Sequence, residues 1–568
     1  MKAALCPGMY IEVPPSAYFQ QSFGPGEALG NILKHGIADR RHLSIQNMLS
    51  MELDSDVKRD PMAKLEPLCA EPTRQEGQLV SEIDERQLPA DRFSLWSTVG
   101  VQFSVTGSPL AIGSYLQLVM GAGGSPYFFW CLVVAIMGQF LICVSLAELS
   151  SVYPHAAGTA YWVSVMAPPK RAHFLSYCNG MSVCLAFTMA TCGTLVYCGT
   201  FIMELVGFLW SNYSPELWHV YICVLGAVTL STLLNTIWIR MVPSITGFLI
   251  IFINSATVFL FITLLVKTNP KASASTVFLD IQNSTGWSSD GIVFLIALLP
   301  GGMVISMFDT ATHMAEELPR PDKQVWQVMV LTNLMNAIVT IVMCLGLLFC
   351  LTHPENLLNP IGDMPILQLC WDAWPNRGFL ITVILCYTIM NIFASVSLQY
   401  ATSRVIWSFS KTGAFPFSSI LSKVNTSLEV PVNSVIATGV IVTAICVLVF
   451  GPQTVQNGLF GTAGLFFVFA YLSPIMLLLK RGRKYIPQSR SFNLGRAGPL
   501  INILACCWGL TLAVFLCFPM YLPVTLETMN WTSVCAAGFS ALVLGNWFWV
   551  RSRYHLLHGL YIDRPDGF

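Results

Sequence analysis

The residue with the clearest chemical role is Asp309, a carboxylate in an otherwise apolar stretch beside the helix-breaking triplet Pro300-Gly301-Gly302. An ionisable group at membrane depth is costly, so such groups mark transport pathways by default. Desolvation raises a carboxylate's proton affinity and a nearby cation lowers it. Asp309 is therefore a candidate proton acceptor and a candidate counter-charge for a bound ammonium group. In a structural alternative, it accepts hydrogen bonds from Thr310, Thr312 or His313.

A second helix-breaking cluster lies near the start of the apolar region. Its residues are Ser104, Val105, Thr106, Gly107, Ser108 and Pro109. Proline removes a backbone donor, and glycine lowers the cost of opening a helix. Two interrupted helices at corresponding positions of two repeats indicate a transporter's binding site, since their exposed amides and carbonyls can hold a carboxylate and an ammonium together. The alternative for either break alone is a packing kink.

Composition predicts the elements that hold these residues. The 568 residues are 54% hydrophobic and 11% charged, with a mean hydropathy of +0.62, which is typical of a polytopic membrane protein. The 30 basic and 30 acidic residues balance, which argues against a nucleic-acid partner. Apolar windows of about 20 residues, the length that spans a bilayer, predict twelve transmembrane helices. They lie near 94–120, 126–149, 174–205, 217–238, 242–266, 291–315, 326–352, 379–406, 433–451, 456–479, 499–521 and 529–550.

Basic residues predict the orientation of these spans. The loops on one side hold most of the Lys and Arg residues, including the basic run 480–496, whereas the other side holds only Lys267, Lys271 and Arg377. By the positive-inside rule, both tails face the cytosol. The glycosylation sequons that then fall in outside loops are at Asn212, Asn283 and Asn530. The sequon at Asn425 falls in a cytosolic loop and is interpreted as a chance tripeptide.

Three parts are expected along the chain. The composition predicts a cytosolic, largely disordered tail over residues 1–92. A twelve-helix domain is expected over 93–551, and a second cytosolic tail over 552–568. Met48 and Met51 are alternative start sites to Met1. The 18 cysteines show no metal-ligand spacing and are interpreted as packing residues. No Ser/His/Asp, HExxH or phosphate-loop pattern is present, so we expect no enzyme and no metal or other cofactor.

Three segments resemble the fungal amino acid/choline transporter family of the amino acid, polyamine and organocation superfamily. They are 145–162 at the end of span 2, 308–317 at the end of span 6, and 403–417 after span 8. Their spacing is similar to that of the family, and the resemblance covers about residues 92–552.

The resemblance implies an all-α leucine-transporter fold, with two inverted repeats of five helices, two appended helices, and interruptions in spans 1 and 6. It implies a substrate-binding strip from Ser104 to Pro109 and from Pro300 to Asp309, closed by spans 3, 8 and 10. The strip's second part contributes Gly301, Gly302, Ser306, Phe308 and Asp309. Candidate gating residues at the cytosolic mouth are Glu148, Glu317 and Arg404, and the loop after Tyr153 would gate the inner path.

The implied function is a plasma-membrane permease that imports a small nitrogenous solute, such as an amino acid, 4-aminobutyrate or choline. Asp309 makes a proton the expected coupling ion, although no lysine occurs in span 5, where some proton-coupled relatives have one. Thr106-Gly107-Ser108-Pro109 replaces the Gly-Ser-Gly of many relatives, which reduces the donors for a carboxylate. Aromatic residues near the site are Phe103, Phe308 and Tyr387. The alternatives are an exporter of a nitrogenous metabolite and a nutrient receptor that signals through its tail.

Overall fold

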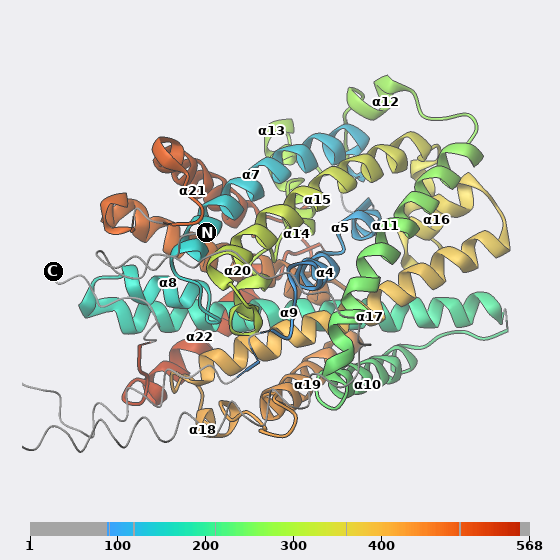
Figure 1. Ribbon diagram of the computed structural model, residues 1–568. Helices are drawn as coiled ribbons and strands as arrows, with labels where there is room; N and C mark the ends of the chain where they lie inside the picture. The colour runs from blue at the N-terminus through green and yellow to red at the C-terminus, as the bar shows by residue number, and fades with distance from the viewer. Residues whose placement is uncertain are drawn as a thin grey trace, which may run out of the picture. The chain divides into compact units, whose positions relative to one another are not determined.

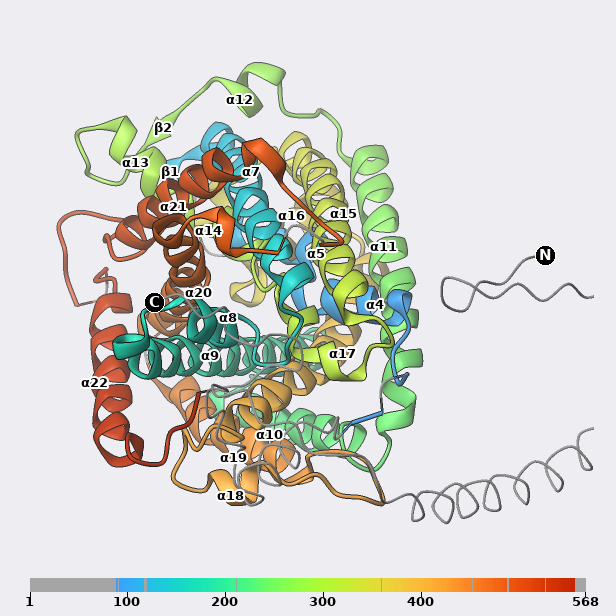
Figure 2. The ribbon, with the colours of Figure 1, turned by 60° about the vertical axis from the view of Figure 1, so that its left-hand side comes forward.

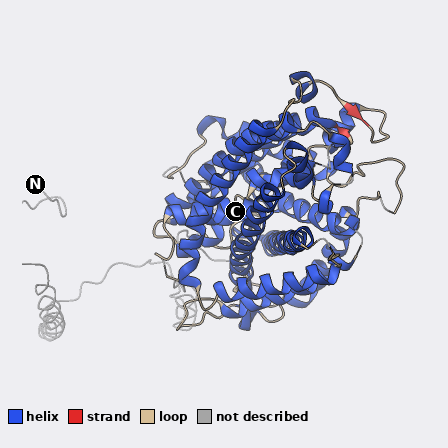
Figure 3. Ribbon diagram, turned by 90° about the vertical axis from the view of Figure 1, so that its right-hand side faces the viewer, coloured by secondary structure: helices blue, strands red, loops and turns tan. Residues whose placement is uncertain are grey.

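The computed structural model describes residues 88–89, 91–116, 120–210, 212–358, 360–451, 453–487, 490–526 and 528–556. All of them belong to one unit that spans 78–568. Most of the predicted tails, with Met48 and Met51, lies outside these residues. Almost every described element is a helix (Figure 3).

Ten helices in the described part of the chain are long and apolar enough to cross a membrane. They are α7 (Gly124–Val152), α9 (Pro169–Leu209), α10 (Leu217–Leu234), α11 (Val242–Lys267), α15 (Pro321–Cys350), α17 (Arg377–Ser410), α19 (Val432–Cys446), α20 (Gln453–Arg481), α21 (Gly498–Phe515) and α22 (Thr532–Val550). Large apolar side chains are exposed on the outer helices, for example Ile251 and Val258 on α11 and Leu542 and Phe548 on α22. Contiguous apolar surfaces of this kind face lipid, so this is a multi-pass, all-α membrane protein.

The two remaining predicted windows, 94–120 and 291–315, are divided into short helices. The first contains α4 (Leu95–Thr106), α5 (Ser108–Ala111) and η1 (Ile112–Tyr115), and the second contains α13 (Asp290–Ile296), α14 (Leu299–Val304) and η3 (Thr310–Glu317). Gly107 separates α4 from α5 with φ +51°, and Met307 precedes η3 with φ +61°. These left-handed conformations cannot continue a right-handed helix, which is why neither window forms one long helix.

Short elements connect the long helices. The α-helices among them are α8 (Thr159–Met166), α12 (Ala274–Phe278), α16 (Pro365–Ala373) and α18 (Ser418–Leu421). The 3-10 turns are η2 (Ile239–Met241), η4 (Pro354–Leu358), η5 (Ile361–Asp363), η6 (Val447–Phe450), η7 (Arg483–Tyr485) and η8 (Gly495–Ala497). Two strands, β1 (Ala122–Gly123) and β2 (Gln282–Asn283), pair antiparallel, with Ala122 opposite Asn283.

The interrupted helices lie inside a layer of continuous ones. α4 packs against α11, α15 and α17, and α14 packs against α7 (Figures 1 and 2). The approach of α14 to α7 requires glycine, because a Cβ atom on Gly301 would lie 2.7 Å from the Cβ atom of Ala135. The long helix α9 packs against α10, α17 and α20. This arrangement surrounds both helix breaks with α7, α9, α15, α17 and α20.

Candidate functional site

A cavity of about 130 Å³ lies between the two helix breaks. The first break contributes Ser104, Val105, Thr106 and Gly107 to its wall, and the second contributes Met303, Val304, Ser306 and Met307. Further wall residues come from α9, α17 and α20, the helices of spans 3, 8 and 10. The cavity therefore occupies the place that the sequence predicts for a bound solute.

The predicted binding strip divides into two groups. Its residues on the cavity wall are Ser104, Val105, Thr106, Gly107 and Ser306. Its residues away from the described wall are Ser108, Pro109, Gly301, Gly302, Phe308 and Asp309. Ser108 instead joins the two breaks, because its hydroxyl donates to the carbonyl oxygen of Val304 at 2.7 Å. Gly301 and Gly302 serve the packing of α14.

The polar groups of the first break are largely engaged. Ser104 donates to the hydroxyl of Ser397 on α17 at 2.8 Å, and Thr106 accepts from the amide of Asn336 on α15 at 2.7 Å. At the start of α5, the amides of Leu110 and Ala111 donate to the carbonyl of Gly107. Pro109 has no amide hydrogen. Few backbone donors of this break therefore remain to bind a carboxylate.

The cavity wall is aromatic and carries no formal charge: none of its described residues is Asp, Glu, Lys or Arg. Its aromatic residues are Tyr115, Tyr197, Phe201, Tyr387 and Phe467. Tyr387 stacks on Phe201 with ring centroids 5.0 Å apart, and its hydroxyl donates to the carbonyl of Leu110 at 2.9 Å. Of the aromatic candidates from the sequence, Tyr387 lines the cavity, whereas Phe103 and Phe308 do not. Aromatic faces of this kind attract organic cations.

Asp309 is fully buried beneath the second break. Its Oδ1 accepts a hydrogen bond from the hydroxyl of Tyr471 on α20 at 2.6 Å, and its Oδ2 lies 3.4 Å from Nε2 of His313. The hydroxyls of Thr310 and Thr312 donate to backbone carbonyls instead. Of the three donors weighed from the sequence, only His313 therefore faces the carboxylate.

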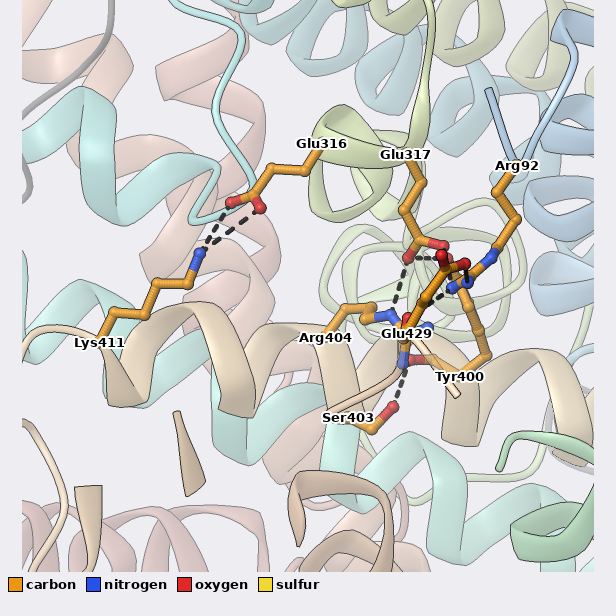
Figure 4. A network of polar contacts seen from close by, with 8 residues as sticks. All are labelled: Arg92, Glu316, Glu317, Tyr400, Ser403, Arg404, Lys411 and Glu429. Atoms are coloured by element: carbon orange, nitrogen blue, oxygen red, sulfur yellow. Dashed lines mark hydrogen bonds and ion pairs between the residues drawn. The ribbon is translucent and has the colours of Figure 1, made fainter. Parts of the chain in front are cut away.

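Glu317 is the centre of a network at the end of η3 (Figure 4). It is buried, and it accepts hydrogen bonds from Nε of Arg404 at 2.8 Å and from the hydroxyl of Tyr400 at 2.5 Å. Arg92, directly before the first predicted span, lies 3.1 Å from Glu317 and also binds the backbone and carboxylate of Glu429. The guanidinium groups of Arg404 and Arg92 thus supply positive charge on both oxygens of this buried carboxylate.

Glu148 forms a different cluster at the end of α7. Its carboxylate binds Arg483, lies 3.0 Å from Arg490, and accepts from the backbone amide of Leu494 at 2.9 Å. The structure thus joins two of the predicted gating residues, Glu317 and Arg404, and gives Glu148 other partners.

Sequence reasoning missed Arg92, Tyr400 and Tyr471 as partners of these carboxylates. Each lies more than 80 residues from its carboxylate. A single sequence holds no pairing signal over that distance. Arg483 and Arg490 belong to the basic run that predicts orientation, and the structure adds that both contact Glu148.

The predicted outside sequons differ in their surroundings. Asn212 is exposed. The side-chain amide of Asn283 donates to Trp287 and Asp290, and that of Asn530 donates to the carbonyls of Leu516 and Phe518. In the described part of the chain, no group of three or more His, Cys, Asp or Glu side chains could hold a metal ion.

Comparisons with known proteins agree on one class. A family model described as amino acid permease matches residues 93–539. The chain is 27% identical over 460 residues to a choline transporter of Saccharomyces cerevisiae, covering 80% of each chain. It is 25% identical to amino-acid permease 2 of Neurospora crassa, over 83% of this chain and 87% of that protein. It is 26% identical to amino-acid permease BAT1 of Arabidopsis thaliana, over 86% of this chain and 97% of that protein.

Proposed function

This chain belongs to the amino acid permease family, and from that premise we propose that it imports a small nitrogenous solute by alternating access around the cavity between its two helix breaks. It is a transporter and not an enzyme. The observation that carries the proposal is the position of the cavity, which has helix breaks on one side and α9, α17 and α20 on the other. Discontinuous helices of this kind form substrate sites in transporters with inverted repeats.

The proposed topology has twelve spans of the leucine-transporter type, in two inverted repeats of five with two appended helices. The ten long helices supply ten spans, α4 with α5 and η1 supplies span 1, and α13 with α14 and η3 supplies span 6. We propose that both tails face the cytosol and that the protein lies in the plasma membrane. The charge bias of the loops supports this orientation.

The favoured substrate is a small organic cation of the choline type. Its support is the uncharged aromatic wall of the cavity, the small number of amide donors left at the first break, and the similarity to a protein named choline transporter. Cation–π contacts with such a wall are worth about 0.5–2 kcal/mol each. The second candidates are a neutral amino acid and 4-aminobutyrate, which similarity to amino-acid permeases supports.

The proposed inner gate is the network of Glu317, Arg404, Tyr400 and Arg92. It joins the start of the first span to the ends of η3 and α17, so its opening would free three elements at once. The proposed coupling ion is a proton bound at Asp309. That residue lies next to the second break, and its burial makes a permanent unpaired charge costly.

The experiment is uptake of radiolabelled choline, 4-aminobutyrate, L-alanine and L-arginine into cells that lack their own permeases. Phe201→Leu, on the cavity wall, should lower uptake of a cationic substrate by about 2- to 30-fold, as expected from one cation–π contact. Phe103→Leu is the matched control, because Phe103 is equally buried but lies off the cavity wall. Uptake of none of the four compounds, or equal loss in both variants, would contradict the proposed substrate site.

Efflux from preloaded cells tests the direction of transport in the same strains. Deletion of residues 1–87 separates a permease from a receptor, because a permease should keep its uptake without this segment.

A further inference from the structure

His313 connects Asp309 to the loop after Tyr153, for which the family resemblance implies a gating role on the inner path. Its side chain is fully buried and makes a T-shaped contact with the ring of Phe187 on α9. Nδ1 lies 2.8 Å from the backbone carbonyl oxygen of Ala156, and Nε2 lies 3.4 Å from Oδ2 of Asp309. Ala156 belongs to the loop between α7 and α8. The imidazole therefore stands between two oxygen acceptors, one on each side.

A neutral His313 cannot donate a hydrogen bond to both oxygen acceptors. A neutral imidazole carries one N–H, so one ring nitrogen must face its oxygen with a lone pair. A carbonyl oxygen can only accept, so Nδ1 carries the hydrogen and Nε2 presents its lone pair to Asp309. Two acceptors then face each other in a buried site, and in the described part of the chain neither Nε2 nor Oδ2 has another hydrogen-bond partner. Unsatisfied buried polar atoms of this kind are costly.

One additional proton satisfies every group. It can lie on Nε2, giving an imidazolium beside a carboxylate, or on Oδ2, giving a carboxylic acid that donates to the imidazole. The distance of 3.4 Å is slightly longer than an ordinary hydrogen bond, so a small side-chain rotation closes it. We propose that Asp309 and His313 together form the proton-binding site, and that the bound proton holds the Ala156 loop against η3.

Neighbouring groups favour this role. Tyr471 donates to the other carboxylate oxygen at 2.6 Å, and the thiol of Cys143 on α7 lies nearby. From α4, Gln102 accepts from the backbone amide of Ala311 within η3. The charged groups at the end of η3 are already paired, Glu317 with Arg404 of α17 and Glu316 with Lys411. Because these charged groups already have partners, we assign the bound proton to Asp309 and His313 alone.

The loop is seated closely on η3. Gly158 has φ +53°, and a Cβ atom there would lie 2.7 Å from Oγ1 of Thr312. The carbonyl of Ala156 also accepts a longer hydrogen bond, 3.3 Å, from Ser408 of α17. Loss of the extra proton leaves Nε2 and Oδ2 as facing acceptors, and rotation of the imidazole to relieve this contact withdraws its N–H from Ala156. Proton release to the cytosol therefore loosens the inner loop.

The proton site is separate from the solute cavity, since neither Asp309 nor His313 is among the described wall residues. The two sites meet at the second break, where Ser306 and Met307 line the cavity two to three residues before Asp309. Proton and solute are thus coupled through the backbone of this break. This inference rests on the proposed proton coupling and adds the residue that shares the proton and the loop that responds to it.

The test uses purified full-length protein in proteoliposomes, with valinomycin and equal K⁺ on both sides to remove the membrane potential. Radiolabelled choline, 4-aminobutyrate and L-alanine are used in two assays, counterflow at equal pH and accumulation driven by an inside-alkaline pH gradient. His313→Gln should reduce gradient-driven accumulation at least tenfold while counterflow stays measurable. Ser408→Ala is the matched control, because it removes a hydrogen bond to the same carbonyl without removing an ionisable group, and it should keep the gradient dependence.

Gradient-driven accumulation by His313→Gln at the wild-type level would overturn the inference and leave proton coupling intact. Counterflow without gradient-driven accumulation in the wild type would overturn proton coupling itself, and the inference with it. If His313→Gln also loses counterflow, the pH profile of uptake by the Tyr471→Phe variant tests the inference instead. Removing this donor to the carboxylate should move the half-maximal pH of uptake upward by about half a unit or more, and an unshifted pH profile would overturn the inference.

Discussion

Arg404 is a fully buried guanidinium whose counter-charge lies on another element. Its Nε atom binds Glu317, and its Cζ atom lies 4.3 Å from the centre of the Tyr400 ring. A buried ion pair contributes little net stability when intact, but removal of one partner leaves an unpaired buried charge. This makes the network around Glu317 sensitive to the loss of either charge.

Glu317→Gln should therefore lower the free energy of unfolding by about 3–5 kcal/mol, measured by thermal unfolding in detergent. Glu316→Gln is the matched control at the neighbouring position. Its partner Lys411 is partly exposed, with 26% of the side chain accessible, so the control should lose at most about 1 kcal/mol. Equal losses in the two variants would contradict a special role for the buried pair.

At the level of elements, apolar windows predicted the ten long helices of the described chain, because each of these windows forms one uninterrupted helix. The division of the first window was visible in Gly107 and Pro109. The predicted breaking triplet Pro300-Gly301-Gly302 instead lies inside α14, and the second window is divided before this helix, at 297–298, and after it, at 305–309. The second left-handed residue, Met307, was not predicted, because a methionine carries no sequence signal for positive φ. The short helices α12 and α16 were also not anticipated, since helices of 5 and 9 residues are too short to give a membrane-spanning window.

Gly158, at the end of the loop between α7 and α8, packs against Thr312 of η3, and its replacement tests that contact. Gly158→Ala should reduce uptake at least several-fold, because alanine is strained at φ +53° by about 1–3 kcal/mol and its Cβ would press on Thr312. Gly226→Ala on α10 is the control, since a Cβ there meets nothing within 4 Å. We expect its uptake and expression to match the wild type. Normal uptake by Gly158→Ala would show that the loop need not seat closely for transport.

For the whole molecule, the charge of the loops predicts one orientation in the membrane, while the use of each sequon also depends on its local contacts. Asn212 is exposed, whereas the side-chain amides of Asn283 and Asn530 already donate two hydrogen bonds each. Attachment of a glycan at either of these two sites would disrupt those contacts.

Asn212→Gln should accordingly remove most of the mobility shift that a glycosidase produces on a gel, and Asn530→Gln should leave it unchanged. The measurement is the apparent mass of the membrane-inserted protein before and after glycosidase treatment. A glycan on Asn425 instead would reverse the predicted orientation of every loop.

The small pairing of β1 with β2 has a mechanical consequence. It joins the segment before α7 to the segment before α13, and the hydroxyl of Tyr127 on α7 also donates to the carbonyl of Asp290 at 3.0 Å. The N-terminal ends of α7 and α13 are therefore tied to each other. We expect these two ends to move together in a change of conformation, so the distance between spectroscopic labels placed on them should stay constant during transport.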